Sequence, residues 1–505
     1  MKKISFKILT LTFIAFFASS CSSYLDINRD PSVPQATDAV NILPPVLSQM
    51  VRGETFDTRF ICRYIQNVSA STAGGDDFER QGYAPGSDNM GEKWRSHYWS
   101  IGENVDLMIA DATAKKNADI VGAAKAIRAW SWQSCTDYHG EMILKQAWEP
   151  NRYVFDYDSQ DQIYAEVVRL CNEALTNLDD KTGIARLQLG DLVYKGNTDK
   201  WKRFIYGVLA RNANHINNKK SLYKPDDVIK YCDLALQSND DNFAVPHAAT
   251  SSLDANFFGI LRNNISTYRP TTTIIQLLDG TTFGKVRDPR LPIMFASCPD
   301  TVWRGVVPFS ADPNNTVGNT KRIPNLWGLP PTSPYPGTGR WIYDDKAAHY
   351  IMTYAEILFM KAEAAFNKGD KATAFDTYKK AIAAHMDFCG VSAANKATFL
   401  ASAAIPATAD ALGIADIMQQ KYIALYFHGA IETWVDMRRY HYNPLVYTTF
   451  VTPTGAFLYP DNGGKLAYRV RPRYNSEYVW NLASLSKLYG DKPDYHTIEQ
   501  WFSQP

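Results

Sequence analysis

Residues 350–386, YIMTYAEILFMKAEAAFNKGDKATAFDTYKKAIAAHM, carry the clearest structural pattern in this 505-residue chain. The first part spaces its apolar residues three and four apart, as on one face of a helix, at Ile351, Tyr354, Leu358, Ala362 and Ala365. Gly369 and Asp370 then predict a helix end. The second part carries small and aromatic residues at Ala374, Tyr378 and Ala381, which would let two antiparallel helices approach closely. Together with Phe366 and Gly369, this spacing matches a tetratricopeptide hairpin.

Weaker forms of the same hairpin pattern occur earlier in the chain, at residues 161–178 and 225–238. Helical periodicity is also present at about 40–70, 92–117, 120–138 and 199–217. Tandem helix hairpins stack side by side, so we expect an all-α dominated fold built as a short α-solenoid. A set of unrelated amphipathic helices is the alternative that the pattern leaves open.

The periodicity disappears between about residues 239 and 348, where Gly, Pro, Asn and Thr alternate with scattered aromatic residues. Irregular segments of this length are commonly functional or disordered, and the aromatic content argues against disorder. We therefore expect a loop-rich half packed against the helices and acting as the recognition region. The predicted organisation is a signal peptide at 1–20, a lipidated cysteine and tether at 21–45, a helical scaffold at 46–238, the loop-rich region at 239–348, and a C-terminal helical and loop region of the same domain at 349–505.

The N-terminus predicts an export signal of the lipoprotein type. Lys2, Lys3 and Lys7 precede the apolar residues 8–18, and small serines lead to Cys21. The apolar stretch is shorter than the roughly 20 residues of a permanent membrane span. We expect cleavage before Cys21 and acyl chains on its thiol, which would anchor an otherwise soluble protein. An ordinary secretory signal followed by a chance cysteine is the alternative.

Composition excludes several other classes of protein. The chain has 53 basic and 52 acidic side chains that are interspersed, so it lacks the basic surface expected for nucleic-acid binding. The remaining cysteines are expected to be buried free thiols, although disulfides stay open in an exported protein, at Cys62, Cys135, Cys171, Cys232, Cys298 and Cys389. Motifs for zinc, nucleotides or an EF-hand are absent from the sequence, and we expect neither a metal site nor a cofactor.

Several segments, in a common order, resemble the SusD/RagB family of surface lipoproteins. They are residues 24–31; Trp94, Tyr98 and Asn104; 126–130 with 136–140; 157–160 with Ile163 and Tyr164; 201–202 with 209–211; 288–291; 354–364; 420–421 with 424–425; 432–434 with Arg438 and Arg439; and 471–474. The resemblance implies four tetratricopeptide-like hairpins packed against a loop-rich half. It also implies lipid-anchored residence on the outer face of an outer membrane, and a SusC-like TonB-dependent transporter as partner. Residues 141–144 depart from the family pattern because they lack its proline.

The helical segment at 350–367 contains one pair of carboxylates of the kind that a glycosidase uses as a catalytic dyad. Glu356 and Glu363 share one helical face, but seven residues of helix separate them by about 10.5 Å. That distance is at or beyond the roughly 6.5–9.5 Å of inverting glycosidases and far beyond that of retaining ones. We expect structural carboxylates paired with Arg438 or Arg439, and no catalytic residues.

The candidate ligand-binding residues are mostly aromatic and acidic. Aromatic rings accept the C–H faces of sugars, and carboxylates accept their hydroxyls. The candidates in the loop-rich region are Trp303, Trp327, Tyr335, Trp341, Tyr343, Asp344 and Asp345. A second patch on a Gly-hinged loop contributes Asp77, Arg80 and Tyr83. The alternative for the rings is that they fill the small core of the loop-rich half, with two or three of the five facing solvent. We expect core positions for Trp94, Trp99, Trp130 and Trp132.

Three functions remain open at this point. The first is a cell-surface lipoprotein that captures an oligosaccharide and delivers it to its transporter, and the second is a peptide-binding or mainly structural lid of such a transporter. The first function predicts that Trp303, Trp327 and Trp341 converge on one exposed cleft, and the second predicts that they are buried apart. The third, a surface hydrolase, is disfavoured by the carboxylate spacing.

Overall fold

The computed structural model describes residues 37–70, 76–328 and 340–505. Cys21, Tyr335, the predicted signal peptide and most of the predicted tether lie outside these ranges.

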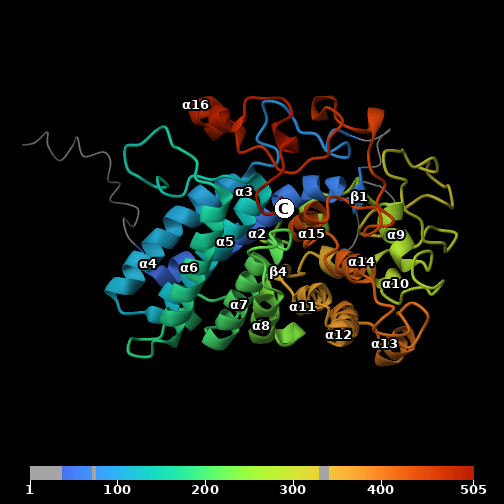
Figure 1. The fold of residues 1–505 in the computed structure, drawn as a ribbon, viewed down its shortest axis with the longest axis horizontal. Helices are drawn as coiled ribbons and strands as arrows, with labels where there is room; N and C mark the ends of the chain where they lie inside the picture. Colours follow the sequence, from blue (N-terminus) through green and yellow to red (C-terminus); the bar gives the residue numbers. More distant parts are fainter. Residues whose placement is uncertain (1–36, 71–75, 329–339) are drawn as a thin grey trace, which may run out of the picture.

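A row of helices forms the body of the protein (Figure 1). Each helix packs on the next one in the row, which is α4 (Asn104–Ala114), α5 (Ala118–His139), α6 (Gln160–Asp179), α7 (Thr198–His215), α8 (Pro225–Leu234), α11 (Tyr354–Lys368) and α12 (Lys371–Cys389). Helices α11 and α12 form the hairpin expected from the sequence, and α6 and α8 overlap the weaker repeats at 161–178 and 225–238. The predicted helix-dominated fold with tetratricopeptide-like packing is therefore confirmed.

The hairpin of α11 and α12 turns where the sequence predicted. Gly369 adopts the left-handed conformation, with φ of 89°, at the end of α11. The Asp370 side chain then accepts a hydrogen bond from the backbone N–H of Thr373 and caps α12. The start of the hairpin differs from the prediction, because Thr353 caps α11 and the residues before it form strand β4 (His349–Met352). Ile351 therefore lies in a strand rather than on the helix face.

Helix α2 (Ala39–Tyr64) crosses the row and contacts α3 (Glu92–Arg95), α4 and α15. Its N-cap is Asp38, so the helix begins inside the segment that was predicted to be a tether up to residue 45. Pro44 and Pro45 lie within the helix and remove two backbone donors. The burial of the apolar side chains of Leu43 and Leu47 offsets that loss.

The loop-rich region is closed at its base by a two-stranded sheet. Strand β2 (Phe243–Val245) pairs antiparallel with β4, so the chain leaves and re-enters the helical body at one place. A second small sheet pairs β1 (Val68–Ser69) with β3 (Arg269–Pro270) and ties the region to the end of α2. The region also contains two short helices, α9 (Thr272–Leu278) and α10 (Leu291–Met294).

The C-terminal part contributes α13 (Ala393–Leu400), α14 (Ile414–Ala424), α15 (Ala430–Arg439) and α16 (Leu482–Leu485). Two segments have π-helical turns, η1 (Ser96–Glu103) and η8 (Tyr474–Tyr478). Short 3₁₀ turns occur at η2 (Leu187–Leu189), η3 (Asn239–Asp241), η4 (Ile260–Arg262), η5 (Trp341–Tyr343), η6 (Gly455–Phe457), η7 (Pro460–Asn462), η9 (Ser486–Leu488) and η10 (Tyr495–Thr497).

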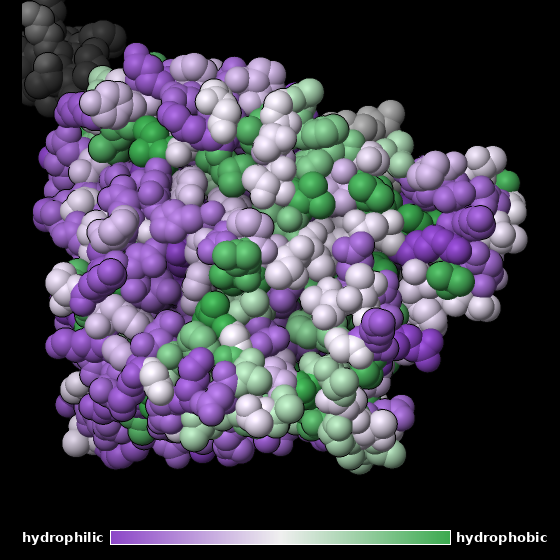
Figure 2. Space-filling model, turned by 45° about the vertical axis from the view of Figure 1, so that its right-hand side comes forward, coloured by the Kyte–Doolittle hydropathy of each residue, from purple (hydrophilic) through white to green (hydrophobic). Residues whose placement is uncertain are grey.

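Two large hydrophobic clusters form the interior. One lies within the row of helices and the first half of α2, and the other joins the second half of α2 to α9, α11, α12, α14 and α15. The six cysteines outside the N-terminal segment are buried and free. Hydrophilic and hydrophobic side chains are interspersed on the face that Figure 2 brings forward. Among the described residues, no helix combines the length and the apolar character that a membrane crossing requires.

Candidate functional site

The structure places the loop-region aromatic candidates against the interior. Trp327 and Tyr343 are buried, and the indole N–H of Trp327 donates to the Phe258 carbonyl over 2.8 Å. Trp303 and Trp341 are half-buried and pack against the same core cluster. The glycan hypothesis for this region requires three tryptophans to converge on an open cleft. Trp303, Trp327 and Trp341 do not meet this requirement. The fifth ring, Tyr335, lies outside the described residues.

The acidic candidates beside these rings serve local structure. Asp344 accepts from the Lys346 N–H over 2.9 Å, as in a turn. Asp345 is buried and accepts from the Leu261 N–H over 2.9 Å, which joins the two ends of the loop-rich region.

The second predicted patch forms a connected group at the surface. Arg80 pairs with Asp77 over 3.3 Å, and its guanidinium lies 5.9 Å from the centre of the Tyr459 ring. The Tyr83 hydroxyl donates to Asp461 over 2.7 Å. Tyr83 also lines a cavity of about 180 Å³ together with Tyr64, Arg471, Tyr474 and Tyr478. The structure thus brings the three sequence candidates of this patch together beside a tyrosine-rich pocket.

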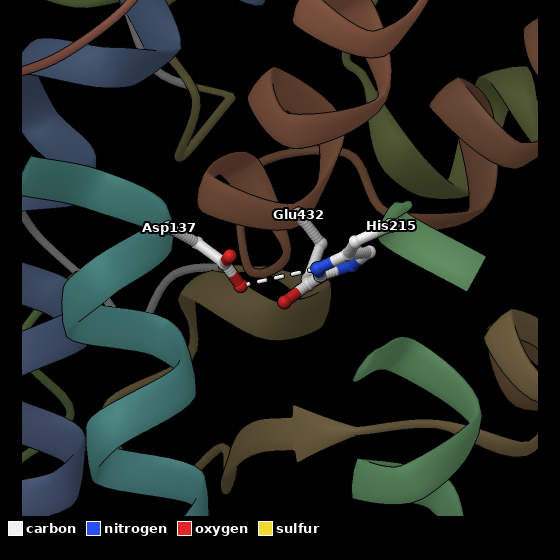
Figure 3. A group of neighbouring side chains, drawn as sticks. All are labelled: Asp137, His215 and Glu432. Atoms are coloured by element: carbon white, nitrogen blue, oxygen red, sulfur yellow. Dashed lines mark hydrogen bonds and ion pairs between the residues drawn. The ribbon is translucent and has the colours of Figure 1, made fainter. Parts of the chain in front are cut away.

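One buried cluster has the composition of a metal site. Asp137, His215 and Glu432 present ligand atoms that lie within 4.8 Å of one another (Figure 3). The His215 Nδ1 lies 3.1 Å from Asp137 and its Nε2 lies 3.0 Å from Glu432, so each ring nitrogen faces a carboxylate. Burial alone would lower the pKa of His215, but the two carboxylates raise it to about 9. An imidazolium that donates from both nitrogens has no free lone pair, so the cluster fits an ion pair better than a metal site.

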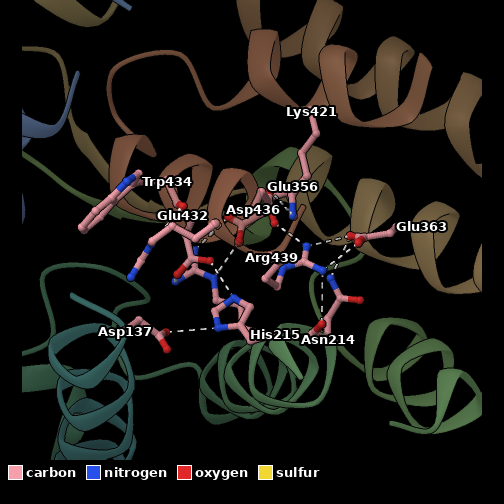
Figure 4. Close-up of polar contacts among 12 residues, drawn as sticks. Asp137, Asn214, His215, Glu356, Glu363, Lys421, Glu432, Trp434, Asp436 and Arg439 are labelled. Carbon is pink, nitrogen blue, oxygen red and sulfur yellow. Dashed lines mark hydrogen bonds and ion pairs between the residues drawn. The ribbon is translucent and has the colours of Figure 1, made fainter. Parts of the chain in front are cut away.

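This cluster is part of a larger buried ionic network (Figure 4). Arg211 pairs with Glu356 over 2.6 Å and lies 3.5 Å from Glu432. Lys421 pairs with Asp436 over 2.8 Å. Arg439 contacts both Asp436 and Glu363, the latter over 2.8 Å. The network joins α5, α7, α11, α14 and α15 in the interior.

The network includes Glu356 and Glu363, the two carboxylates whose spacing along the helix is too large for a catalytic dyad. Arg439 is one of the two partners predicted for them and holds Glu363, whereas the partner of Glu356 is Arg211. Burial opposes ionisation of Glu363, but Arg439 and Lys421 lower its pKa below the ordinary value. Glu356 and Glu363 are both buried, and each is held in an ion pair, as expected of structural groups.

An open cleft of about 690 Å³ lies on another part of the surface. Its walls come from η1 and α4, from the connection between α5 and α6, and from the segment around η8. The aromatic lining residues are Trp94, Tyr98, Trp99, Trp148 and Phe155. We call this the Trp99 cleft, because the Trp99 side chain is 67% exposed.

The two π-helical segments of the described chain both line this cleft. Tyr98, Trp99 and Glu103 belong to η1, while Ser476 and Glu477 belong to η8. π-Helical turns are rare and occur frequently at functional sites. Their coincidence at one cleft marks it as a candidate site.

Trp148 is held in the cleft by several specific contacts. Its φ of 60° is unusual for a bulky residue, and such strain clusters at functional sites. The indole N–H donates to the Tyr98 carbonyl over 2.8 Å. A Cβ atom at Gly102 would lie 2.1 Å from the ring, so only glycine allows the ring to approach. The Arg128 guanidinium lies 4.7 Å from the ring centre and pairs with Asp106.

Glu477 organises the floor of the cleft. It is buried and accepts hydrogen bonds from the Trp94 indole over 3.2 Å, from the Tyr157 hydroxyl, and from the Asn481 amide over 3.0 Å. Burial, followed by the Glu477 carboxylate, raises the pKa of Tyr157 well above its ordinary value. The Trp94 and Tyr157 rings are therefore both held in place by hydrogen bonds that they donate to the Glu477 carboxylate.

Sequence reasoning missed this cleft. The expected core positions are confirmed for Trp94, Trp130 and Trp132, but the expectation for Trp99 is wrong. A π-helical segment departs from the 3.6-residue repeat on which the prediction depended, so the side-chain positions shift around the axis. The only local signal was the density of aromatic residues at 94–99.

Comparison with protein families identifies the class to which this architecture belongs. A family model described as SusD-like, "starch-binding associating with outer membrane", matches residues 31–459. The chain therefore belongs to the SusD-like family. A search of curated proteins found no match.

Solved structures show the same fold. A SusD/RagB family protein from Bacteroides thetaiotaomicron is 22% identical, with 93% of this chain and 99% of the other covered and a TM-score of 0.68. A SusD homolog from Bacteroides uniformis has a TM-score of 0.71 at 18% identity, over 92% of this chain and 99% of the other. A chitin-binding SusD homolog from Flavobacterium johnsoniae has a TM-score of 0.68 at 19% identity, over 92% and 98%.

The network predicts a large effect of removing one cation. Arg439→Met leaves Glu363 buried without its guanidinium, and we expect a loss of about 3–5 kcal/mol in the free energy of unfolding. Urea unfolding followed by tryptophan fluorescence measures it. Arg169→Met is the matched control, because Arg169 makes exposed ion pairs that contribute about 0–1 kcal/mol. Equal losses in both variants would contradict the role of the network.

The network also predicts a pH dependence. The folded pKa of His215, about 9, lies above the unfolded value of about 6.5. Its contribution to stability is therefore complete below about pH 6.5 and is lost as the pH rises through about 9. The urea midpoint of the wild-type protein should decrease over this range, and His215→Gln should reduce the size of the decrease. An unchanged pH profile in His215→Gln would contradict the assignment.

Proposed function

We propose that the protein is a cell-surface lipoprotein that binds an oligosaccharide and delivers it to a SusC-like TonB-dependent transporter in the outer membrane. The proposal places the ligand in the Trp99 cleft. The acyl chains on Cys21 would hold the protein beside its transporter, facing the cell exterior. The family description, with its starch binding and outer-membrane association, supports the general role.

The chemistry of the Trp99 cleft is the observation that carries the proposal. A sugar ring presents a flat C–H face that packs on an aromatic ring, while its hydroxyls need polar partners at the edge. The exposed Trp99 and the half-buried Trp148 offer such rings on two different walls. Glu103, Asp106 and Arg473 offer polar groups at the same cleft. Its volume of about 690 Å³ falls in the range of small-molecule sites.

The proposal assigns binding without catalysis. A glycosidase needs two carboxylates that face the bond to be cleaved, at a separation of about 5–9.5 Å. At the cleft, Glu477 is occupied by three hydrogen bonds, Asp106 pairs with Arg128, and Glu149 pairs with Arg152. The fourth carboxylate, Glu103, is exposed. Such an arrangement offers no matched acid and base. A peptide ligand is the alternative for the same cleft, and a ligand panel separates the two.

Trp99 provides the direct test of the site. Trp99→Ala should weaken binding of the best oligosaccharide in a glycan panel by about tenfold, because it removes an exposed stacking surface. Isothermal titration of the purified protein measures the affinity. Phe457→Ala is the matched control, since this ring is 50% exposed but does not line the cleft. Equal affinities for wild type and Trp99→Ala would place the ligand elsewhere, and binding only to peptides would favour the alternative.

Cys21 tests the cellular part of the proposal. Cys21→Ala should release the protein from the membrane fraction and impair glycan uptake, because the acyl anchor is lost. Its affinity for the ligand should stay unchanged, because Cys21 lies far along the chain from every residue of the cleft. Fractionation, uptake and titration measure the three quantities. A loss of affinity would show that the N-terminal segment contributes to the site.

A further inference from the structure

The charges around the Trp99 cleft are unbalanced. Four carboxylates line it, at Glu103, Asp106, Glu149 and Glu477, against two guanidiniums, at Arg95 and Arg473. Both guanidiniums have an acidic partner, because Arg95 shares Glu92, over 3.2 Å, with Arg52, and Arg473 pairs with Asp88 over 2.7 Å. Glu92 balances one of its two arginines, so this group adds one positive charge at the edge of the cleft.

Two of the four carboxylates are compensated by neighbouring arginines. Asp106 pairs with Arg128 over 2.6 Å, and Glu149 pairs with Arg152 over 2.5 Å. These two pairs add no net charge to the cleft. The carboxylates of Glu103 and Glu477 remain, and together they outweigh the one arginine charge that the shared Glu92 leaves unbalanced.

Glu103 and Glu477 have no cationic partner among the described residues. Glu103 is exposed on η1, four residues after Trp99. Glu477 is 5% exposed, and its three hydrogen-bond donors are all neutral. The cleft therefore carries a negative potential from one carboxylate at its rim and one at its floor. The partly buried position of Glu477 reduces the screening of its charge by salt.

We infer that the Trp99 cleft selects its ligand by charge: it takes oligosaccharides that carry amino groups most tightly, neutral ones next, and those that carry carboxylates least. The inference rests on the proposed function and names the ligand class of the same cleft. A uronate group entering the cleft meets two unpaired carboxylates, against the single excess arginine charge of the Arg52, Glu92 and Arg95 group. A protonated amine meets the same two carboxylates with the opposite sign of interaction. Aromatic stacking on Trp99 is common to all three ligands and does not discriminate among them.

The expected selectivity follows from the Coulomb interaction. Two charges about 8 Å apart in a partly hydrated cleft, with an effective dielectric constant of about 40, change the dissociation constant by about fivefold. We therefore expect a uronate-bearing ligand to bind at least about fivefold more weakly than its neutral counterpart. An amine-bearing ligand should bind more tightly than the neutral one by a similar factor.

The experiment compares ligands that differ only in charge. The detergent-solubilised full chain is titrated with hexamers of glucose, glucosamine and glucuronate in the β-1,4 series, and with hexamers of glucose, galactosamine and galacturonate in the α-1,4 series. Titrations at about pH 6 keep the amines protonated and the carboxylates ionised. Repeating them at high salt should reduce the differences between the ligands, because screening weakens the charge term.

Two variants of Glu103 assign the effect to the cleft. Glu103→Gln should narrow the difference between neutral and uronate ligands, and Glu103→Lys should narrow it further or reverse it. Asp410→Lys is the matched control, because Asp410 is an exposed carboxylate outside the cleft that makes no ion pair among the described residues. It changes the net charge of the protein by the same amount and should leave the selectivity unchanged. The urea midpoint of each variant confirms that the fold is intact.

The possible results separate this inference from the proposed function. If the neutral hexamers bind and the uronate hexamers bind equally well or better, the charge selection is overturned. Glycan binding itself would then remain in place. A change of selectivity in Asp410→Lys equal to that in Glu103→Lys would also overturn it, because the effect would then come from net charge alone. Failure of every glycan in both series and in the wider panel would overturn the proposed function itself.

Discussion

The buried ionic network imposes the constraint on which the arrangement of the helices depends. It contains five carboxylates, Asp137, Glu356, Glu363, Glu432 and Asp436, and four cations that pair with them, Arg211, His215, Lys421 and Arg439. Moving any one of these charges out of water is costly unless a counter-charge is in place. The five helices that carry them must therefore assemble together, with α15 inserted against α5, α7 and α11. Hydrophobic packing alone tolerates more than one register, whereas a set of paired charges tolerates few.

The same network positions the Trp99 cleft. Asp137 is held by His215 and by the Tyr164 hydroxyl, which fixes the last turn of α5. The next residue, Tyr138, accepts a backbone hydrogen bond from Val470 over 2.9 Å, and Val470 leads into the segment that ends in η8. The chain beyond α5 then forms the wall that carries Trp148. Two walls of the cleft thus start from one helix end that the network holds in place.

Local features of the sequence were sufficient to predict the hairpins but not their partners. The spacing at residues 354–381 and the glycine at 369 determine two helices and the turn between them, because helix periodicity and capping are local. Tyr350 and Met352 were expected to be helical, yet they pair with β2, more than 100 residues earlier in the chain, where no spacing rule applies. The pairing of Glu356 with Arg211 is equally distant. Two of the loop-region rings, Trp327 and Tyr343, are buried for a related reason, since a region with little regular structure needs them to fill its own core.

The proposed function requires the Trp99 cleft to release its ligand as well as to bind it. Stacking on Trp99 suits this requirement, because the contact depends on ring area rather than on a set of directional hydrogen bonds, and a sugar chain can slide or leave without breaking many bonds at once. Several polar groups of the cleft already have partners next to it: Asp106 pairs with Arg128, Arg473 pairs with Asp88, and Glu477 accepts from three neutral donors. A ligand therefore gains little from them individually and meets mainly the shape and the net charge of the cleft. Walls whose polar groups already have partners thus favour recognition of a class of ligand at moderate affinity, which is the combination that the proposed hand-over to a transporter needs.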